Sequence, residues 1–211
     1  YPPEDLILRD DLLDQAYEAV ITLGEEKPES FLVVGYPKKE GNSIYNCAGV
    51  LRNKSIVTEY KKQELPNYEV FDEKRYFQPG NSAGIFEVNG YRVALSVCED
   101  IWHEKVINQA HESKANLLLN INASPFHLEK INERKKLISS QSSKYSLPIV
   151  YANQVGGQDE LVFDGTSMVM DGDGKQVMQL AKFEEDKKVV SFVSKEDGNL
   201  KSEITEDIPE D

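Results

Sequence analysis

Strand-like and helix-like segments alternate along the middle of this 211-residue chain, and the alternation limits the folds that it can adopt. Apolar runs at 91–97, 116–122 and 149–154 are separated by helical patterns at 103–115 and about 128–145. Strands joined by helices usually pair in parallel, and the helices cover the resulting sheet. The sequence therefore predicts an α/β fold with a parallel sheet at its centre.

The segments around this region predict antiparallel strands. Asn89-Gly90 joins two apolar runs and is a strong signal for a type I′ hairpin. Residues 62–84 have neither a helical nor a strand period, and a long ordered loop of this kind is usually functional. The other expected elements are a helix at 11–23 capped by Asp10, strands at 31–36, 43–51, 55–61 and 85–88, a hairpin of 161–170 with 176–180, and a last strand at 188–193.

Composition and charge exclude several classes of protein. The net charge of −13 argues against a nucleic acid or an anionic membrane surface as partner. No apolar run approaches the ~20 residues of a membrane span, and no signal peptide opens the chain. Two cysteines are too few for a disulfide framework, so we expect a reducing, cytoplasmic setting.

The composition changes near the end of the chain. After Lys195 the sequence becomes polar and acidic, which is typical of a linker that leaves a domain. We therefore predict one domain over 1–195 and an acidic linker over 196–211.

Cys98 is the first candidate for chemistry, because it ends an apolar strand just before a helix. Ligands bind at this edge of such sheets, and a helix N-terminus stabilises a thiolate. The alternative is a small buried hydrophobic residue, which is what most cysteines are. Glu99 and Asp100 oppose a thiolate by charge repulsion, so a reactive Cys98 needs a cation nearby. Lys62, at the start of the long loop, is the candidate, although most lysines are simply solvated.

The histidines do not predict a metal site. His103 and His111 are eight residues apart on one expected helix, which separates them by roughly 12 Å along its axis.

Five segments in a fixed order carry a more specific signal. They are 1–6 (YPPEDL), Lys62 with 65–68 (LPNY) and 70–73 (VFDE), 98–102 (CEDIW), 122–127 (NASPFH) and 155–165 (VGGQDELVFDG). Together these segments resemble the nitrilase (carbon–nitrogen hydrolase) superfamily. They are most similar to the N-terminal glutaminase domains of the glutamine-dependent NAD synthetases.

The resemblance implies a nitrilase-like αββα sandwich and a Glu-Lys-Cys catalytic triad. It places Cys98 as the nucleophile, Lys62 as the triad lysine and Glu73 as a second carboxylate beside that lysine. The backbone N–H of Glu99 would help Lys62 to stabilise the oxyanion. The glutamine pocket would be lined by Tyr68, Phe71 and Ser124, with 159–164 at its border.

The resemblance also implies parts that lie outside this sequence. The triad glutamate and the first strand of the sandwich are expected before Tyr1. An ATP-using synthetase domain is expected beyond the linker, and ATP and magnesium would belong to that domain, while this one needs no cofactor. L-glutamine is the expected substrate and a homo-oligomer the expected assembly.

Two other functions remain open. The first is another amidase or carbamoylase of the same superfamily, although the 159–165 segment favours the synthetase. The second is a catalytically silent domain that keeps only the fold, which the presence of both Cys98 and Lys62 argues against.

Overall fold

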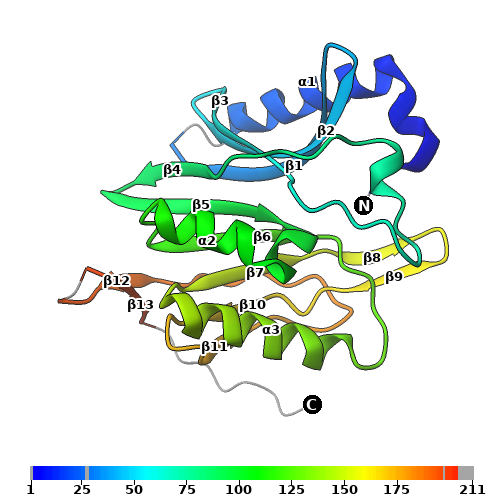
Figure 1. Ribbon diagram of the computed structural model, residues 1–211. Coiled ribbons are helices and arrows are strands. Elements are labelled where there is room, and N and C mark those ends of the chain that lie inside the picture. The colour runs from blue at the N-terminus through cyan, green and yellow to red at the C-terminus, as the bar shows by residue number, and fades with distance from the viewer. Residues whose placement is uncertain (1, 27–28, 197, 204–211) are drawn as a thin grey trace.

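The structure is a computed structural model that describes residues 2–26, 29–196 and 198–203 (Figure 1). Its helices are α1 (Asp10–Glu26), α2 (Glu104–Glu112) and α3 (Lys130–Tyr145), with the 3-10 helices η1 (Glu4–Leu8), η2 (Glu73–Arg75) and η3 (Cys98–Trp102). Its strands are β1 (Leu32–Glu40), β2 (Ser43–Arg52), β3 (Ser55–Lys61), β4 (Gly84–Val88), β5 (Tyr91–Val97), β6 (Leu117–Asn122), β7 (Ile149–Asn153), β8 (Val155–Gln158), β9 (Leu161–Asp164), β10 (Met168–Met170), β11 (Gln176–Gln179), β12 (Phe192–Ser194) and β13 (Leu200–Ser202).

Two sheets form the centre of the molecule. The larger sheet has the strand order β11-β10-β7-β6-β5-β4, and β5, β6 and β7 run parallel as the alternation of segments predicts. The smaller sheet is the antiparallel meander β1-β2-β3. Two further hairpins, β8-β9 and β12-β13, stand apart from both sheets.

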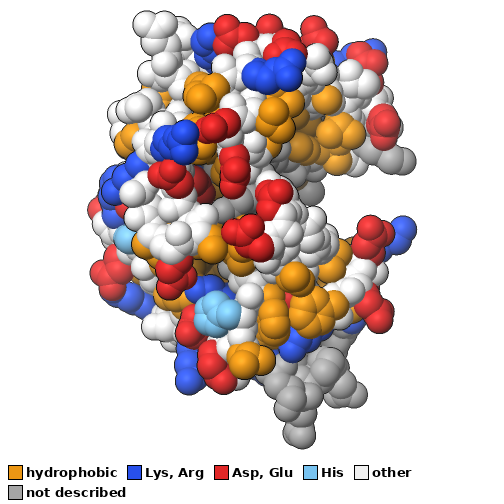
Figure 2. All heavy atoms as spheres, turned by 90° about the vertical axis from the view of Figure 1, so that its right-hand side faces the viewer, with side chains coloured by type: hydrophobic (Ala, Val, Ile, Leu, Met, Phe, Trp, Pro, Cys, Tyr) orange, Lys and Arg blue, Asp and Glu red, His pale blue; other side chains and the backbone are white. Residues whose placement is uncertain are grey.

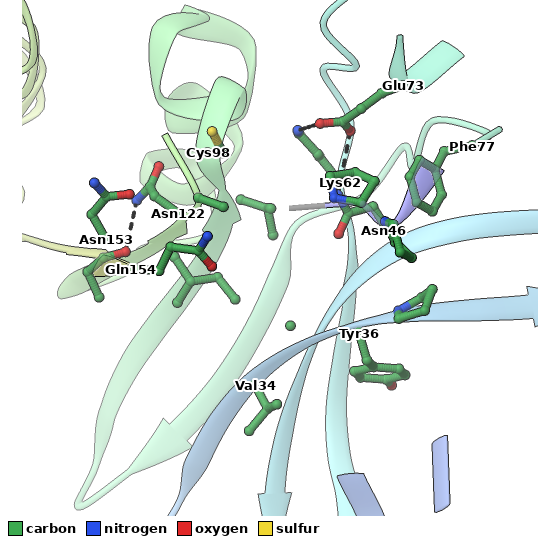
Figure 3. A pocket seen from close by; sticks show the side chains of 18 of the residues that line it. Val34, Tyr36, Asn46, Lys62, Glu73, Phe77, Cys98, Asn122, Asn153 and Gln154 are labelled. Carbon is green, nitrogen blue, oxygen red and sulfur yellow. Dashed lines mark hydrogen bonds and ion pairs between the residues drawn. The ribbon is translucent and has the colours of Figure 1, made fainter. Parts of the chain in front are cut away.

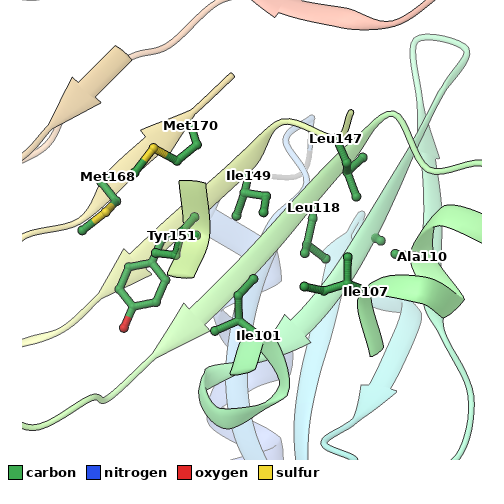
Figure 4. Close-up of a cluster of buried hydrophobic side chains, with 11 residues drawn as sticks. Ile101, Ile107, Ala110, Leu118, Leu147, Ile149, Tyr151, Met168 and Met170 are labelled. Atoms are coloured by element: carbon green, nitrogen blue, oxygen red, sulfur yellow. The ribbon is translucent and has the colours of Figure 1, made fainter. Parts of the chain in front are cut away.

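Helices cover the outer face of each sheet (Figure 1). Successive side chains of a strand point to opposite faces of the sheet, so one set can pack against the helices and the other against the second sheet. Leu118 of β6 packs with Ile107 of α2 and Ile138 of α3 in one buried cluster, shown in Figure 4. The flanking Leu117 and Leu119 pack instead in a cluster that joins the two sheets. On the opposite side, α1 packs against β1 and β2. The expected αββα order of layers is confirmed.

The predicted turn between β4 and β5 is also confirmed. Val88 and Tyr91 are paired across it, and Asn89 and Gly90 both have positive φ, at 51° and 81°. A type I′ turn requires this conformation at both central residues.

The expected single strand over 161–170 is wrong. Gly165 and Thr166 have positive φ, at 67° and 50°, and a strand cannot continue through two such residues. The chain changes partner there, so that β9 pairs with β8 while β10 pairs with β7 and β11.

The last expected strand, at 188–193, is displaced towards the C-terminus. Phe192–Ser194 forms β12 and pairs with β13 at Leu200–Ser202. Asp171 holds this hairpin on the domain, because its carboxylate accepts a hydrogen bond from the backbone N–H of Ser202 at 2.9 Å. A short strand thus falls inside the predicted linker, of which residue 197 and residues 204–211 lie outside the described part. The boundary at 195 stays a prediction.

Over the described residues, no helix combines the length and apolar character needed to cross a lipid bilayer.

Candidate active site

Cys98 follows β5 directly and is the first residue of η3. Its φ of 46° lies in the left-handed region, which non-glycine residues seldom occupy. Such backbone strain is found preferentially at functional sites. Val97, the last residue of β5, is paired with Ile121 of the parallel strand β6, so Cys98 and Asn122, the next residue along each chain segment, come next to each other at one edge of the sheet.

A cavity of about 530 Å³ opens at this edge. It lies between the two sheets, with Val34 and Tyr36 of β1 on one side and Val97 and Ile121 on the other. Figure 2 shows this face of the molecule hollowed between the layer that carries α1 and the layer below it. Cys98 lines the cavity, so a small substrate that enters it can reach the sulfur.

Lys62 and Glu73 form a buried ion pair in the wall of this cavity. The Lys62 ammonium lies 2.6 Å from Glu73 Oε1, and the two side chains are only 1% and 6% exposed. Figure 3 shows the ammonium pointing toward the side of the cavity where Cys98 lies. The structure therefore brings together Cys98 and Lys62, which the resemblance assigns to catalysis, and Glu73, the second carboxylate expected beside the lysine.

Asn46 of β2 completes this group, although no pattern in the sequence points to it. Its amide Nδ2 lies 3.5 Å from the second oxygen of Glu73, and its backbone carbonyl accepts the backbone N–H of Lys62 at 2.8 Å. Only the register of β2 against β3 places Asn46 beside Lys62, and that register cannot be deduced from either strand alone.

Burial and the charges of neighbouring groups have opposite effects on the pKa of Cys98, and also on the pKa of Lys62. Burial raises the pKa of the Cys98 thiol, and the positive charge of Lys62 only partly offsets this rise. Burial pulls the pKa of Lys62 down, but the Cys98 sulfur once it is ionised, together with the negative charges of Glu73 and Asp100, outweighs burial and raises it. Lys62, paired with Glu73, is a stable cation, while the raised pKa of Cys98 favours the thiol over the thiolate that a helix N-terminus would stabilise. A base is needed to ionise it.

The two acids after Cys98 are held by other partners. Glu99 accepts a hydrogen bond from the Tyr68 hydroxyl at 2.9 Å and lies 3.4 Å from His103. Asp100 is fully buried and accepts hydrogen bonds from the backbone and from Tyr60. These partners reduce the repulsion that we expect from the sequence Cys98-Glu99-Asp100.

The aromatic residues expected in the substrate pocket divide between two hollows. Phe71 lines the cavity of Cys98, whereas Tyr68 and Glu99 line a neighbouring hollow of about 620 Å³. The rings of Tyr68 and Phe71 nevertheless touch edge to face, with centroids 5.6 Å apart. The two hollows thus adjoin along these two residues.

Ser124 is buried behind the site. Its hydroxyl accepts a hydrogen bond from Arg134 at 3.1 Å, and the same guanidinium group pairs with Asp164 at 2.8 Å. The cavity is lined by its neighbour Ala123. Contact between Ser124 and a substrate therefore stays a prediction. Arg134 was missed because it lies on a largely polar helix, where a buried arginine has no distinctive pattern.

Asn122 was missed as well. Its amide nitrogen donates to the Asn120 carbonyl and side chain and to the Ala152 carbonyl, at 2.8–3.2 Å. These acceptors fix the orientation of the amide. Its buried Oδ1 has no hydrogen-bond partner among the described residues, and Asn122 lines the cavity beside Cys98 (Figure 3). It is an acceptor at the edge of the site.

The acidic residues that the structure describes do not gather into a metal centre. Within 2–26, 29–196 and 198–203, no three His, Cys, Asp or Glu side chains are arranged to hold an ion.

Comparison with known proteins places this arrangement in a family. The chain is 41% identical over 190 residues to "Glutamine-dependent NAD(+) synthetase" of Aquifex aeolicus, an alignment that covers 88% of this chain and 33% of that protein. It is 39% identical over 198 residues to the protein of the same name from Xanthomonas campestris pv. campestris, with coverage of 93% and 36%. The chain thus spans about a third of the length of these curated relatives.

Solved structures agree with the sequence comparison. The structure of glutamine-dependent NAD+ synthetase from Acinetobacter baumannii, in complex with ADP, superposes with a TM-score of 0.91 at 35% identity, over 99% of this chain and 39% of that one. The sequence pattern described as carbon-nitrogen hydrolase matches residues 26–194, which is most of the chain. This chain belongs to the carbon–nitrogen hydrolase family.

Proposed function

We propose that this chain is the glutamine-hydrolysing domain of a glutamine-dependent NAD synthetase. The observation that carries the proposal is the buried Lys62–Glu73 ion pair on the wall of the cavity that Cys98 lines. A buried ammonium beside a cysteine is suited to amide cleavage, because it stabilises both the attacking sulfur and the oxyanion that forms. The names of the relatives support glutamine as the amide and NAD synthesis as the purpose.

In the proposed reaction, a base takes the proton of Cys98 and the sulfur attacks the side-chain carbonyl carbon of glutamine. Lys62 and the backbone N–H of Glu99 stabilise the oxyanion. The C–N bond then breaks, the nitrogen takes the proton and ammonia leaves. Water hydrolyses the resulting thioester to glutamate and restores the thiol. From the resemblance to the family, we propose that this base is a glutamate that precedes Tyr1.

In the whole enzyme, the ammonia would pass to a synthetase domain that amidates deamido-NAD at the expense of ATP. ATP and magnesium belong to that domain, and this one needs no cofactor of its own. We place the enzyme in the cytoplasm as a homo-oligomer. The Acinetobacter baumannii synthetase binds ADP in its solved structure, which is consistent with nucleotide use by that protein.

The alternative is an amidase or carbamoylase of the same family that acts on another amide. Full-length enzyme should be assayed for ammonia release from glutamine, asparagine, simple aliphatic amides and N-carbamoyl amino acids, with Cys98→Ala as the control. We expect glutamine to be preferred by at least tenfold in kcat/KM and the activity to be lost in Cys98→Ala. Preference for another amide would favour the alternative, and no turnover together with an unreactive thiol would favour a silent domain.

A further inference from the structure

Asp100 is a fully buried carboxylate whose two oxygens each accept two hydrogen bonds. Oδ1 accepts the backbone N–H of Gln63 at 3.1 Å and that of Glu64 at 2.9 Å. Oδ2 accepts the backbone N–H of Val97 and the hydroxyl of Tyr60, both at 2.8 Å. A buried carboxylate with this many donors is fixed in position, since moving it would leave several buried donors without a partner.

The donors flank Lys62 on both sides and include the residue before Cys98. Tyr60 lies two residues before Lys62 and Gln63 directly follows it, while Val97 directly precedes Cys98. β3, which delivers Lys62, belongs to the three-stranded sheet, whereas β5, which delivers Cys98, belongs to the six-stranded sheet. The carboxylate of Asp100 therefore connects the end of one sheet to the end of the other.

We propose that Asp100 is a positioning residue that fixes Lys62 and Cys98 relative to each other for amide cleavage. The inference rests on the proposed function for the reaction that it serves. Asp100 itself need not touch the substrate, because its oxygens are fully engaged by these four donors. Its contribution is geometric, and a displacement of about 1 Å in such a site is enough to cost roughly 100-fold in rate.

Replacing Asp100 by asparagine removes the negative charge and one acceptor oxygen but keeps the size and shape of the side chain. Its single carbonyl oxygen can serve only one of the two pairs of donors, and its NH2 group would face donors on the other side. Asp100→Asn should therefore release either the Lys62 segment or the Cys98 turn while filling the same volume. Tyr60→Phe is a milder test, because it removes one of the four hydrogen bonds and keeps the backbone ones.

The control must disturb a buried carboxylate elsewhere. Asp171 is 5% exposed and also accepts a backbone N–H, from Ser202, but it anchors the β12-β13 hairpin far along the chain from the site. Asp171→Asn should lower the melting temperature without moving Lys62 or Cys98.

The experiment compares full-length wild type, Asp100→Asn, Tyr60→Phe and Asp171→Asn in two assays. The first is glutamine hydrolysis. The second is the rate of Cys98 alkylation by iodoacetamide as a function of pH, read by mass spectrometry, which needs no turnover. For Asp100→Asn we expect at least a tenfold loss of kcat and a KM within threefold of wild type. We also expect an alkylation profile displaced to higher pH, because the loss of the Lys62 charge beside the thiol outweighs the opposite, smaller effect of removing the Asp100 charge.

Tyr60→Phe should change both readouts in the same direction, with about a threefold loss of kcat, and Asp171→Asn should leave both within twofold. Alkylation profiles and kcat values of Asp100→Asn within twofold of wild type would overturn the proposal. If Asp100→Asn does not fold, an unchanged Tyr60→Phe enzyme would overturn it equally. Should wild type fail to hydrolyse glutamine, the proposed function fails, while the alkylation profiles still decide the role of Asp100.

Discussion

The Lys62 ammonium lies 2.6 Å from the Glu73 carboxylate, and solvent reaches almost none of either side chain. Neither charge can be removed without leaving the other buried and unpaired. Breaking a buried ion pair by removing one partner typically destabilises a protein by about 3–5 kcal/mol, because the remaining charge is poorly solvated. This pair therefore links the stability of the domain to its chemistry.

Glu73→Gln should lower the free energy of unfolding by about 3 kcal/mol and reduce glutamine hydrolysis by roughly 100-fold, since Lys62 loses the charge that keeps it protonated. Urea denaturation and an ammonia-release assay would measure the two effects. The exposed pair of Lys144 and Glu104, 2.5 Å apart, provides the control. Glu104→Gln should leave the urea midpoint nearly unchanged, because water solvates both charges of an exposed pair. Equal effects of the two variants would contradict the assigned importance of burial.

The two thiols should differ sharply in reactivity. Cys47 is completely buried in β2, and burial raises its pKa to about 12. Cys98 lines a cavity and has Lys62 nearby to favour its thiolate. After brief treatment with a glutamine-like electrophile such as a diazo or chloromethyl ketone analogue, we expect mass spectrometry to find the adduct on Cys98. Equal modification of both cysteines would contradict the assignment.

On the proposed function, Lys62→Ala should separate the two activities proposed for the full-length enzyme. Lys62 faces the cavity of Cys98, so its loss should abolish NAD synthesis from glutamine. Synthesis from added ammonium chloride should remain within about threefold of wild type, because that reaction bypasses amide cleavage. Parallel assays with the two nitrogen sources test this. Loss of both activities in a folded variant would show that the domains are obligatorily coupled.

Asp100 should make stability depend on pH. Burial raises its pKa to about 6, against about 3.9 for an ordinary aspartate. Between these values the folded state binds a proton that the unfolded state does not, so this group adds stability as the pH falls from 7 toward 4. Relative to Asp100→Asn, wild type should gain about 2 kcal/mol between pH 7 and pH 4.5. Denaturant titrations of both proteins at a series of pH values would check this. If the free energy of unfolding depended on pH in the same way in both proteins, Asp100 would have an ordinary pKa.

Local patterns were sufficient for much of the fold. The Asn89-Gly90 turn, the parallel centre and the helices α1, α2 and α3 follow from hydrophobic period and turn chemistry, which are properties of neighbouring residues. The break at Gly165 was missed, because an apolar run does not reveal that its two halves pair with different strands.

The candidate site was only partly predictable, for a related reason. Cys98 and Lys62 were candidates by their positions in the chain, Glu73 was found only through motifs that resemble a family, and the roles of all three stay predictions. Asn46 and Asp100 act through strand register and through backbone donors remote in sequence, neither of which leaves a local pattern. A buried acid such as Asp100 looks, in sequence, like any of the other acidic residues of the chain.

The site spans two sheets that touch through a shared apolar layer, which includes Ala48 and Val50 from one sheet and Val93 and Leu95 from the other. The distance between Cys98 and Lys62 therefore depends on the thickness of that layer as well as on the hydrogen bonds to Asp100, and a change in the thickness of the layer is expected to alter the proposed turnover. On warming, the proposed activity should fall before secondary structure is lost, because a local separation of the two sheets requires less free energy than global unfolding. Among variants of this layer, the rate of the proposed reaction should therefore respond to changes in packing that are too small to shift the melting temperature.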